Sequence, residues 1–221
     1  MARSPILFVL TSHGQLGDTG RATGFWLAEA AHPWRTFTDA GYQVELASIR
    51  GGRSPIDGAD SSDPVQRAFL DQVDLDAARP VGSVDPAGYR AVLYIGGHGA
   101  MWDFPGNQAV TRIGAEVYAA GGVVAAVCHG PVGLLDIRVP DGSYLVDGKN
   151  LTSFSNAEEA EIGLTTVVPF LLQTALEQRG GRHTDAGIFA PHVVVDGRLV
   201  TGQNPPSSAG VAAEVIRLLA D

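Results

Sequence analysis

Cys128 is the residue of this sequence with the clearest capacity for chemistry. It is the only cysteine among 221 residues and lies in GGVVAAVCHGPVGLL, residues 121–135. The small and β-branched residues before it predict a buried strand, and the apolar run after it predicts a helix. A residue at such a junction occupies a sharp turn that projects its side chain, and Ala126 and Gly130 supply the small neighbours required. We predict a reactive thiolate, favoured by the N-terminus of the following helix; the alternative is a buried structural cysteine.

A thiol nucleophile needs a base and a carboxylate that orients the base. His129 directly follows the cysteine, and the segment SFSNAEEAEIG, residues 153–163, supplies Glu158, Glu159 and Glu161. Each of these glutamates is also explained as a carboxylate in the first turn of a helix, where the dipole favours negative charge. The pattern therefore predicts a Cys–His–Glu site and leaves the choice among the three glutamates open.

Glu29 is a second candidate carboxylate. It stands in TGFWLAEAAHPW, residues 23–34, among apolar neighbours. Burial among such residues raises the pKa of a carboxyl group, so that Glu29 could stay protonated near neutrality and hydrogen-bond a thiolate or move a proton. The alternative is a surface glutamate on an amphipathic turn.

The segment IGGHGAMWDFPG, residues 95–106, is a candidate for binding substrate. Gly96 and Gly97 follow a predicted strand and let backbone N–H groups approach a ligand closely, as an oxyanion hole requires. His98 and Trp102 are expected either to line the pocket or to pack the loop. Ligands of open α/β sheets bind at the carboxyl ends of the strands, where this segment and Cys128 both lie.

The elements that must position these residues follow an alternating pattern. Apolar runs without strict alternation predict buried parallel strands at 5–12, 42–49, 89–97 and 121–127. Helices are expected between them, one started by Pro33 and running to about Ala40, another over 107–122. We predict one α/β domain over residues 1–221, with a doubly wound, mostly parallel sheet sandwiched by helices, in the flavodoxin-like manner.

The last third of the chain adds other elements to this pattern. Asp-Gly pairs between β-prone arms predict hairpins at 145–153 and 193–202. A long helix is expected over 158–179, kinked or split by Pro169, and a final helix over 207–219. The Gly-, Ser-, Pro- and Asp-rich stretch 50–64 is expected to be a loop.

Composition excludes several classes of function. Fifteen basic and twenty-four acidic residues give a net charge of −9, which disfavours nucleic acid as a partner. The apolar run 6–12 is too short to span a membrane, so a cytoplasmic protein without a membrane partner is expected. The six histidines lack metal-ligand spacing, and no phosphate-binding glycine motif occurs. We therefore expect no metal and no cofactor.

Four segments together resemble the ThiJ/PfpI superfamily, whose sheet is similar to that of class I glutamine amidotransferases. They are YIGGHGAMWDFP (94–105), AAVCHGP (125–131), EEAEIG (158–163) and HVVVDGRLVTGQNP (192–205). The pairing of C-H-G-P with G-G-H-G-x-M-W-D looks most like the heat-shock chaperone and glyoxalase III branch. The resemblance implies a site of Cys128, His129 and Glu159, with Glu29 beside the thiol. It further implies cofactor-independent conversion of methylglyoxal and related 2-oxoaldehydes to 2-hydroxy acids such as D-lactate, by a homodimer.

The same resemblance supports rival functions. A holdase chaperone that binds unfolded proteins would need an exposed apolar patch, which the segment 23–40 with its four aromatic residues could supply. A deglycase acting on glycated proteins would use the same site residues. A glutaminase is disfavoured because Val194 stands where the glutamate of its late H-x-E motif belongs. A PfpI-like peptidase is disfavoured because that activity depends on higher assembly.

Overall fold

A seven-stranded sheet forms the centre of the computed structural model, which describes residues 4–220. Its strand order is β10-β11-β7-β6-β1-β3-β5, and every neighbouring pair is parallel except β10 with β11. The strands are β1 (Ile6–Leu10), β3 (Val44–Ser48), β5 (Arg79–Pro80), β6 (Ala91–Tyr94), β7 (Val123–Val127), β10 (Val193–Asp196) and β11 (Leu199–Gly202). The predicted doubly wound, mostly parallel α/β fold is confirmed.

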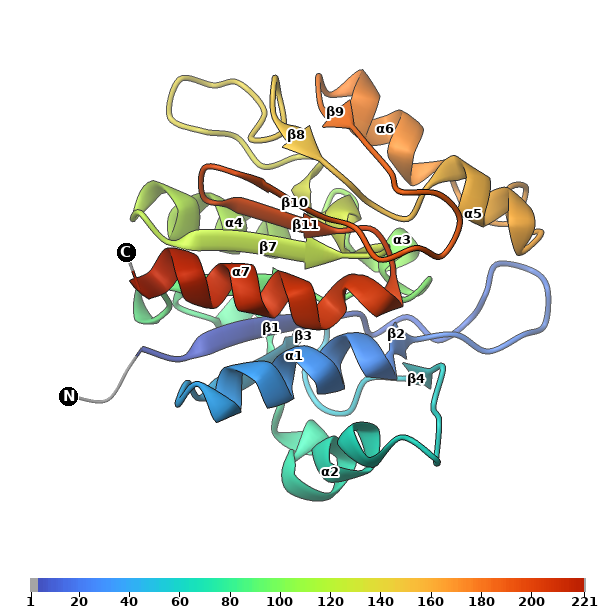
Figure 1. The fold of residues 1–221 in the computed structure, drawn as a ribbon, viewed down its shortest axis with the longest axis horizontal. Coiled ribbons are helices and arrows are strands. Elements are labelled where there is room, and N and C mark those ends of the chain that lie inside the picture. The colour runs from blue at the N-terminus through green and yellow to red at the C-terminus, as the bar shows by residue number, and fades with distance from the viewer. Residues whose placement is uncertain (1–3, 221) are drawn as a thin grey trace.

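Helices cover both faces of this sheet (Figure 1). On one face lie α1 (Leu27–Asp39) and α7 (Ser208–Ala220), with α2 (Pro64–Gln72) packed against α1. On the other lie α4 (Gln108–Ala119), α3 (Ala100–Asp103) and α6 (Leu172–Gln178). In β1, Phe8 contributes to the first core and Leu7 to the second, and both are fully buried. Burial on both faces explains why the strand sequences lack alternation.

The start of α1 differs from the prediction. The helix begins at Leu27, six residues before the expected start, and Pro33 lies inside it. Leu27, Ala30 and Trp34 recur at helical spacing and are buried in the core. The free energy gained by their burial exceeds the cost of the backbone hydrogen bond that Pro33 cannot donate. The early start places Glu29 in the first turn of α1. In addition, α2 was not predicted, and its N-cap Asp63 accepts hydrogen bonds from two backbone N–H groups.

The segment after Cys128 also differs from the prediction. It is a five-residue 3₁₀ helix, Gly130–Leu134, instead of an α-helix. The expected hairpin at 145–153 is wrong, because β8 (Asn150–Leu151) pairs in parallel with β9 (Arg182–His183). The hairpin of β10 and β11 is confirmed. The helix expected over 158–179 is split into α5 (Asn156–Glu161) and α6, with Gly163, at φ +72°, after the first and Pro169 in the connection.

The remaining elements are short. They comprise β2 (Phe25–Trp26) and β4 (Ile56–Asp57), which pair with each other, and the 3₁₀ helices Leu75–Ala77, Val81–Ser83, Pro86–Gly88 and Pro205–Ser207. The expected loop 50–64 is therefore interrupted only by β4 before α2 begins. None of the helices among residues 4–220 has the length and apolar character needed to cross a bilayer.

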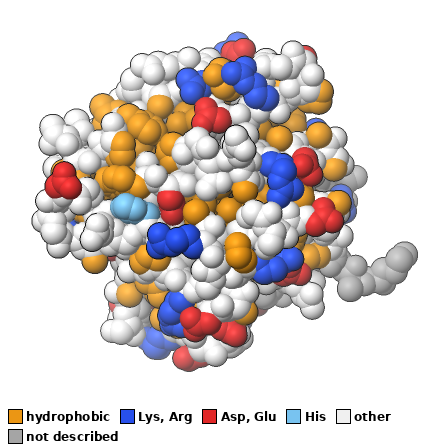
Figure 2. Space-filling view, turned by 180° about the vertical axis from the view of Figure 1, so that it is seen from behind, with side chains coloured by type: hydrophobic (Ala, Val, Ile, Leu, Met, Phe, Trp, Pro, Cys, Tyr) orange, Lys and Arg blue, Asp and Glu red, His pale blue; other side chains and the backbone are white. Residues whose placement is uncertain are grey.

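The segment 23–40 does not form the exposed apolar patch expected of a chaperone. Phe25 and Phe37 are fully buried, and Trp34 is 7% exposed. These rings pack into the core between α1 and the sheet, because α1 turns its apolar face inward. Seen from behind, basic and acidic side chains are interspersed, and hydrophobic side chains gather on the side of α5 and α6 (Figure 2).

Candidate active site

Cys128 lies directly after β7, at the carboxyl end of a central strand, in a strained backbone conformation. Its φ is +59°, a left-handed value that non-glycine residues rarely adopt. The turn is held by hydrogen bonds on both sides: the Cys128 N–H donates to the carbonyl of Gly202 at 2.9 Å, and its carbonyl accepts from Phe154 at 2.8 Å. A Cβ at Gly130 would stand 2.1 Å from the carbonyl oxygen of Tyr94. The small residue predicted at this position is therefore a steric requirement.

His129 connects the thiol to Glu159. Its Nδ1 lies 3.4 Å from Cys128 Sγ, and its Nε2 lies 2.8 Å from Glu159 Oε2. Burial lowers the pKa of His129 to about 4, and the nearby His98 adds to the effect, so the ring is neutral at pH 7. Burial opposes ionisation of Glu159, but hydrogen bonds from both histidines outweigh it and lower the pKa to about 2. A neutral ring that donates Nε2–H to this carboxylate presents the Nδ1 lone pair to the thiol.

Glu158, the neighbouring alternative, has a different role in the structure. It is fully buried and forms a capping box with Ser155 at the start of α5. Its Oε1 also accepts hydrogen bonds from Asn204 and from the backbone N–H of Phe189. The third glutamate, Glu161, is exposed. Of the three, the structure brings only Glu159 into contact with His129.

Glu29 is buried beside the thiol. Its side chain is fully inaccessible to solvent and faces the Cys128 thiol and the N–H of Gly96. Neither carboxyl oxygen has a hydrogen bond of standard geometry among the described residues. Burial raises the pKa of Glu29, and the contacts with the thiol and with the N–H of Gly96 lower it by a smaller amount. The resulting pKa is about 8. The carboxyl group is therefore mostly protonated at neutral pH, as its apolar neighbours predicted.

The thiol itself differs from the expectation. Burial, and secondarily the carboxyl of Glu29, raises the pKa of Cys128 above its ordinary value. A five-residue 3₁₀ helix follows the cysteine, in place of the α-helix whose N-terminus was expected to favour the thiolate. The resting state therefore holds a thiol, which requires a base to take its proton during attack. His129 Nδ1 is in position to do so.

The two glycines after β6 also face this site. A Cβ on Gly96 would stand 2.4 Å from Glu29 Oε2, so the carboxyl packs directly against the backbone there. Gly97 has a φ of +97°, and its N–H points at the Cys128 sulfur. Both residues thus lie where the sequence predicts a backbone oxyanion site.

His98 and Trp102 are placed differently from each other. His98 lines the pocket, and its Nε2 bonds Glu159 Oε1 at 2.9 Å. One carboxylate thus holds two imidazole rings, whose centroids lie 4.0 Å apart. Trp102 does not line the pocket, because α3 turns it toward His13, on which it stacks with centroids 5.1 Å apart. This placement matches the alternative that Trp102 packs the loop, and its contact with substrate stays a prediction.

His98, His129 and Glu159 also have the donor types of a metal site. Their ligand atoms lie within 4.8 Å of one another. The sequence could not reveal this grouping, since the three residues come from three segments that meet only in the fold. Both Nε2 atoms already bond the carboxylate, so the cluster is also complete as a hydrogen-bonded unit.

A cavity of about 300 Å³ opens beside the sulfur, and its wall is mostly apolar. Besides Gly97, His98, Cys128 and His129, the lining residues are Trp26, Phe154, Ile162, Phe189, Pro205 and Pro206. Sequence reasoning did not select these six. Pro205 and Pro206 could have been predicted to lie near the site, because they follow the carboxyl end of β11, the strand that neighbours β7.

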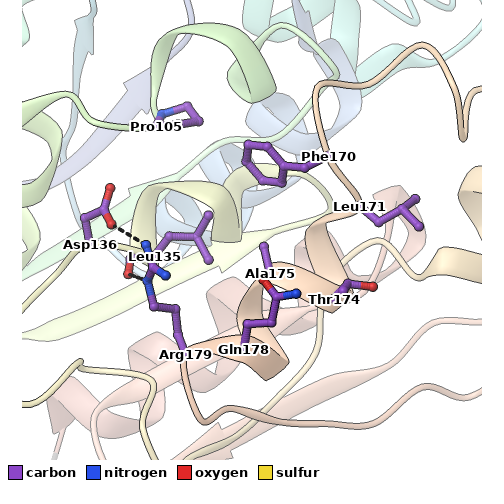
Figure 3. A pocket seen from close by; sticks show the side chains of 9 residues that line it. All are labelled: Pro105, Leu135, Asp136, Phe170, Leu171, Thr174, Ala175, Gln178 and Arg179. Atoms are coloured by element: carbon purple, nitrogen blue, oxygen red, sulfur yellow. Dashed lines mark hydrogen bonds and ion pairs between the residues drawn. The ribbon is translucent and has the colours of Figure 1, made fainter.

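A second cavity, also of about 300 Å³, lies elsewhere in the molecule (Figure 3). Its polar groups include Arg179, which pairs with Asp136 at 3.1 Å and bonds the carbonyl of Leu135. Neither Cys128 nor any residue in contact with it lines this cavity. The candidate nucleophile therefore borders the first cavity and not this one.

Fold and site together define an α/β protein with a cysteine on a strand-end turn and a histidine–glutamate pair beside it. The DJ-1/PfpI family model matches residues 21–218. The glutathione-independent glyoxalase HSP31 of Saccharomyces cerevisiae is 30% identical, over 99% of both chains. Among solved structures, glyoxalase III of Candida albicans is 30% identical (97% of this chain, 96% of that chain, TM-score 0.89). The Rapid Encystment Protein of Francisella tularensis is 34% identical (98% and 99%, TM-score 0.94). The chain belongs to the DJ-1/PfpI family.

Proposed function

We propose that this protein is a glutathione-independent glyoxalase that converts methylglyoxal and related 2-oxoaldehydes to 2-hydroxy acids, with Cys128 as the nucleophile. The observation that carries the proposal is the continuous row of groups at one pocket. The Glu29 carboxyl faces the thiol, the thiol lies 3.4 Å from His129, and His129 lies 2.8 Å from Glu159. Relatives named glyoxalase that match almost the whole chain support it.

The first step is addition of sulfur to the aldehyde carbon. The S–C bond forms as the carbonyl π electrons move to oxygen, and His129 Nδ1 takes the thiol proton. The backbone N–H groups of Gly97 and His129 stabilise the oxyanion. His129 then returns the proton to that oxygen, which gives a neutral hemithioacetal. Glu159 holds the ring in the required tautomer throughout.

The second step moves a proton between two carbons. As a carboxylate, Glu29 removes the hydrogen from C1, and the electrons of that bond move through C2 to the C2 oxygen, which gives an ene-diolate. The C1 hydroxyl passes its proton to the C2 oxygen. C2 then takes back the proton held by Glu29 as the C1 oxygen forms the carbonyl, which gives a thioester of the 2-hydroxy acid. Water then cleaves the thioester and regenerates the thiol. A pKa of about 8 suits Glu29 to this task, because an efficient proton carrier titrates near the working pH.

The dependence of the rate on pH follows from this assignment. We expect kcat/KM to rise about tenfold per pH unit below pH 8 and to level off above it, because only ionised Glu29 can take the proton. Protonation of His129 near pH 4 lies well below this range. Initial rates of methylglyoxal consumption between pH 5.5 and 9.5 measure the profile. A rate that is flat across pH 7 to 9 would exclude Glu29 as the proton carrier.

Removal of metal is expected to leave the activity unchanged, because every step uses side chains of this chain. Enzyme treated with a chelator and desalted should consume methylglyoxal at the untreated rate. Loss of turnover that one divalent metal restores would move the chemistry to the His98–His129–Glu159 cluster.

The remaining expectations belong to the same proposal. A homodimer and contact with unfolded or glycated proteins are predictions from the family resemblance, and a cytoplasmic location is a prediction from the short apolar run near the N-terminus. Size-exclusion chromatography with light scattering tests the first of these, and a monomer at micromolar concentration would contradict it.

A further inference from the structure

We propose that the pocket beside Cys128 selects 2-oxoaldehydes with a bulky hydrocarbon group, aryl groups above all, and that Phe189 seats that group. This inference rests on the proposed function, and it names the substrate class and a residue that determines specificity. Four observations carry it: the size of the cavity, its lining, the backbone strain at Phe189 and the distribution of exposed apolar side chains.

The cavity is much larger than methylglyoxal requires. Its volume is about 300 Å³, whereas a water molecule occupies about 30 Å³ of liquid and methylglyoxal has only five heavy atoms. Methylglyoxal bound through C1 to the sulfur would therefore leave most of the space unfilled. A phenyl group at the same carbonyl would occupy that space.

The lining is suited to a hydrocarbon. No lysine or arginine borders the cavity. Its titratable side chains are Cys128, His129 and His98, and both histidines bond Glu159. A phosphorylated or carboxylated aldehyde would find no cationic partner there. The ring of Phe154 lies between two other rings, with centroids 4.6 Å from His129 and 6.5 Å from Phe189. These are the spacings at which aromatic rings attract one another.

Phe189 has a strained backbone conformation, and burial of its own side chain does not compensate for that strain. Its φ is +56°, and Cys128 is the only other non-glycine residue with positive φ in the range 4–220. The backbone N–H of Phe189 donates to Glu158, a fully buried residue fixed by Ser155 and Asn204. The residue nevertheless remains 45% exposed. A bulky residue at positive φ is costly, and such strain concentrates at functional sites.

Exposed apolar side chains are concentrated at this pocket. Among residues 4–220 the large exposed hydrophobics are Leu70, Ile162, Ile188 and Phe189. Ile162 and Phe189 line the cavity, and Ile188 directly precedes Phe189. Phe189 therefore has a free face at the mouth of the pocket, where an aryl group would cover it.

The test compares phenylglyoxal with methylglyoxal as substrates. We expect the wild type to have a kcat/KM about tenfold or more higher for phenylglyoxal. Phe189→Asn tolerates the left-handed conformation and removes the ring, and it should lower this value about tenfold, mainly through KM, and lower the value for methylglyoxal much less. Retained methylglyoxal turnover also reports that the variant is folded. Phe189→Tyr should restore the preference, and Ile188→Ala, the matched control, should leave both substrates unaffected.

Two results would overturn the inference. One is a wild type that prefers methylglyoxal, and the other is a Phe189→Asn variant that loses both substrates equally. If the wild type converts neither substrate, the proposed glyoxalase function itself is contradicted. The pocket is then probed with acetophenone, an aryl ketone without the aldehyde. Tighter binding of acetophenone to the wild type than to Phe189→Asn would sustain the selection of aryl groups, and equal binding would refute it.

Discussion

Replacing Cys128 with alanine should reduce kcat/KM for methylglyoxal by a factor of about a thousand or more, to the level of the buffer. The sulfur forms the only covalent bond to substrate in the proposed sequence, and no other cysteine exists to replace it. Cys128→Ser is expected to fail as well, because a serine hydroxyl ionises far less readily than a thiol, and neutral His129 is too weak a base to activate it. Both variants are measured with purified protein in glutathione-free buffer.

A matched set of controls separates loss of chemistry from loss of structure. The Cys128 backbone is held by Gly202 and Phe154 through main-chain hydrogen bonds, which an alanine retains. The melting temperature and the circular dichroism spectrum should therefore remain close to those of the wild type. Turnover by folded Cys128→Ala at a rate near that of the wild type would eliminate the nucleophile proposed here.

Replacing Glu29 with glutamine should lower kcat by a factor of about 10² to 10⁴, the usual contribution of a positioned acid or base. The amide has nearly the same shape as the carboxyl and fits the same buried space, but it cannot accept the C1 proton. Glu161→Gln is the matched control. Glu161 is exposed at the end of α5, so this substitution should leave the rate unchanged. Equal activity of Glu29→Gln and the wild type would show that Glu29 does not carry the proton, and His129 would then be the base that transfers it.

The same variant should change the dependence of stability on pH. Burial raises the pKa of Glu29 from 4.5 to about 8, so the folded state binds the proton more tightly than the unfolded state. The contribution of Glu29 to the stability of the wild type is therefore fully present below pH 4.5 and is lost as the pH rises through 8. Glu29→Gln stays neutral, so its advantage in melting temperature should grow over that interval. Parallel melting curves of wild type and variant would contradict a buried, titrating Glu29.

The parts of the site that are local in sequence were predictable. The apolar run before Cys128 and the small residue at Gly130 indicated the strand and the turn, because steric crowding there limits the choice of residue. Glu29 stood among apolar neighbours, and its burial followed from them. The hairpin of β10 and β11 followed from one Asp-Gly turn.

The parts that depend on distant contacts were not predictable. The bond between His98 and Glu159 joins residues 61 positions apart, and nothing near either residue indicates the other. Phe189 adopts positive φ because buried Glu158, 31 positions earlier, accepts its N–H. The other Asp-Gly pair, Asp147-Gly148, did not form a hairpin, because β8 pairs with β9 instead. Turn residues therefore indicate which strands could pair locally, and tertiary contacts determine which of these pairings form.

The most direct test is the identity of the product. Chelator-treated enzyme without glutathione is incubated with methylglyoxal, and lactate is quantified beside the aldehyde consumed, for the wild type and for Cys128→Ala. We predict one lactate formed for each methylglyoxal consumed by the wild type, and none by the variant. Methylglyoxal that disappears without lactate, or lactate formed equally by both proteins, would contradict a glyoxalase that uses Cys128.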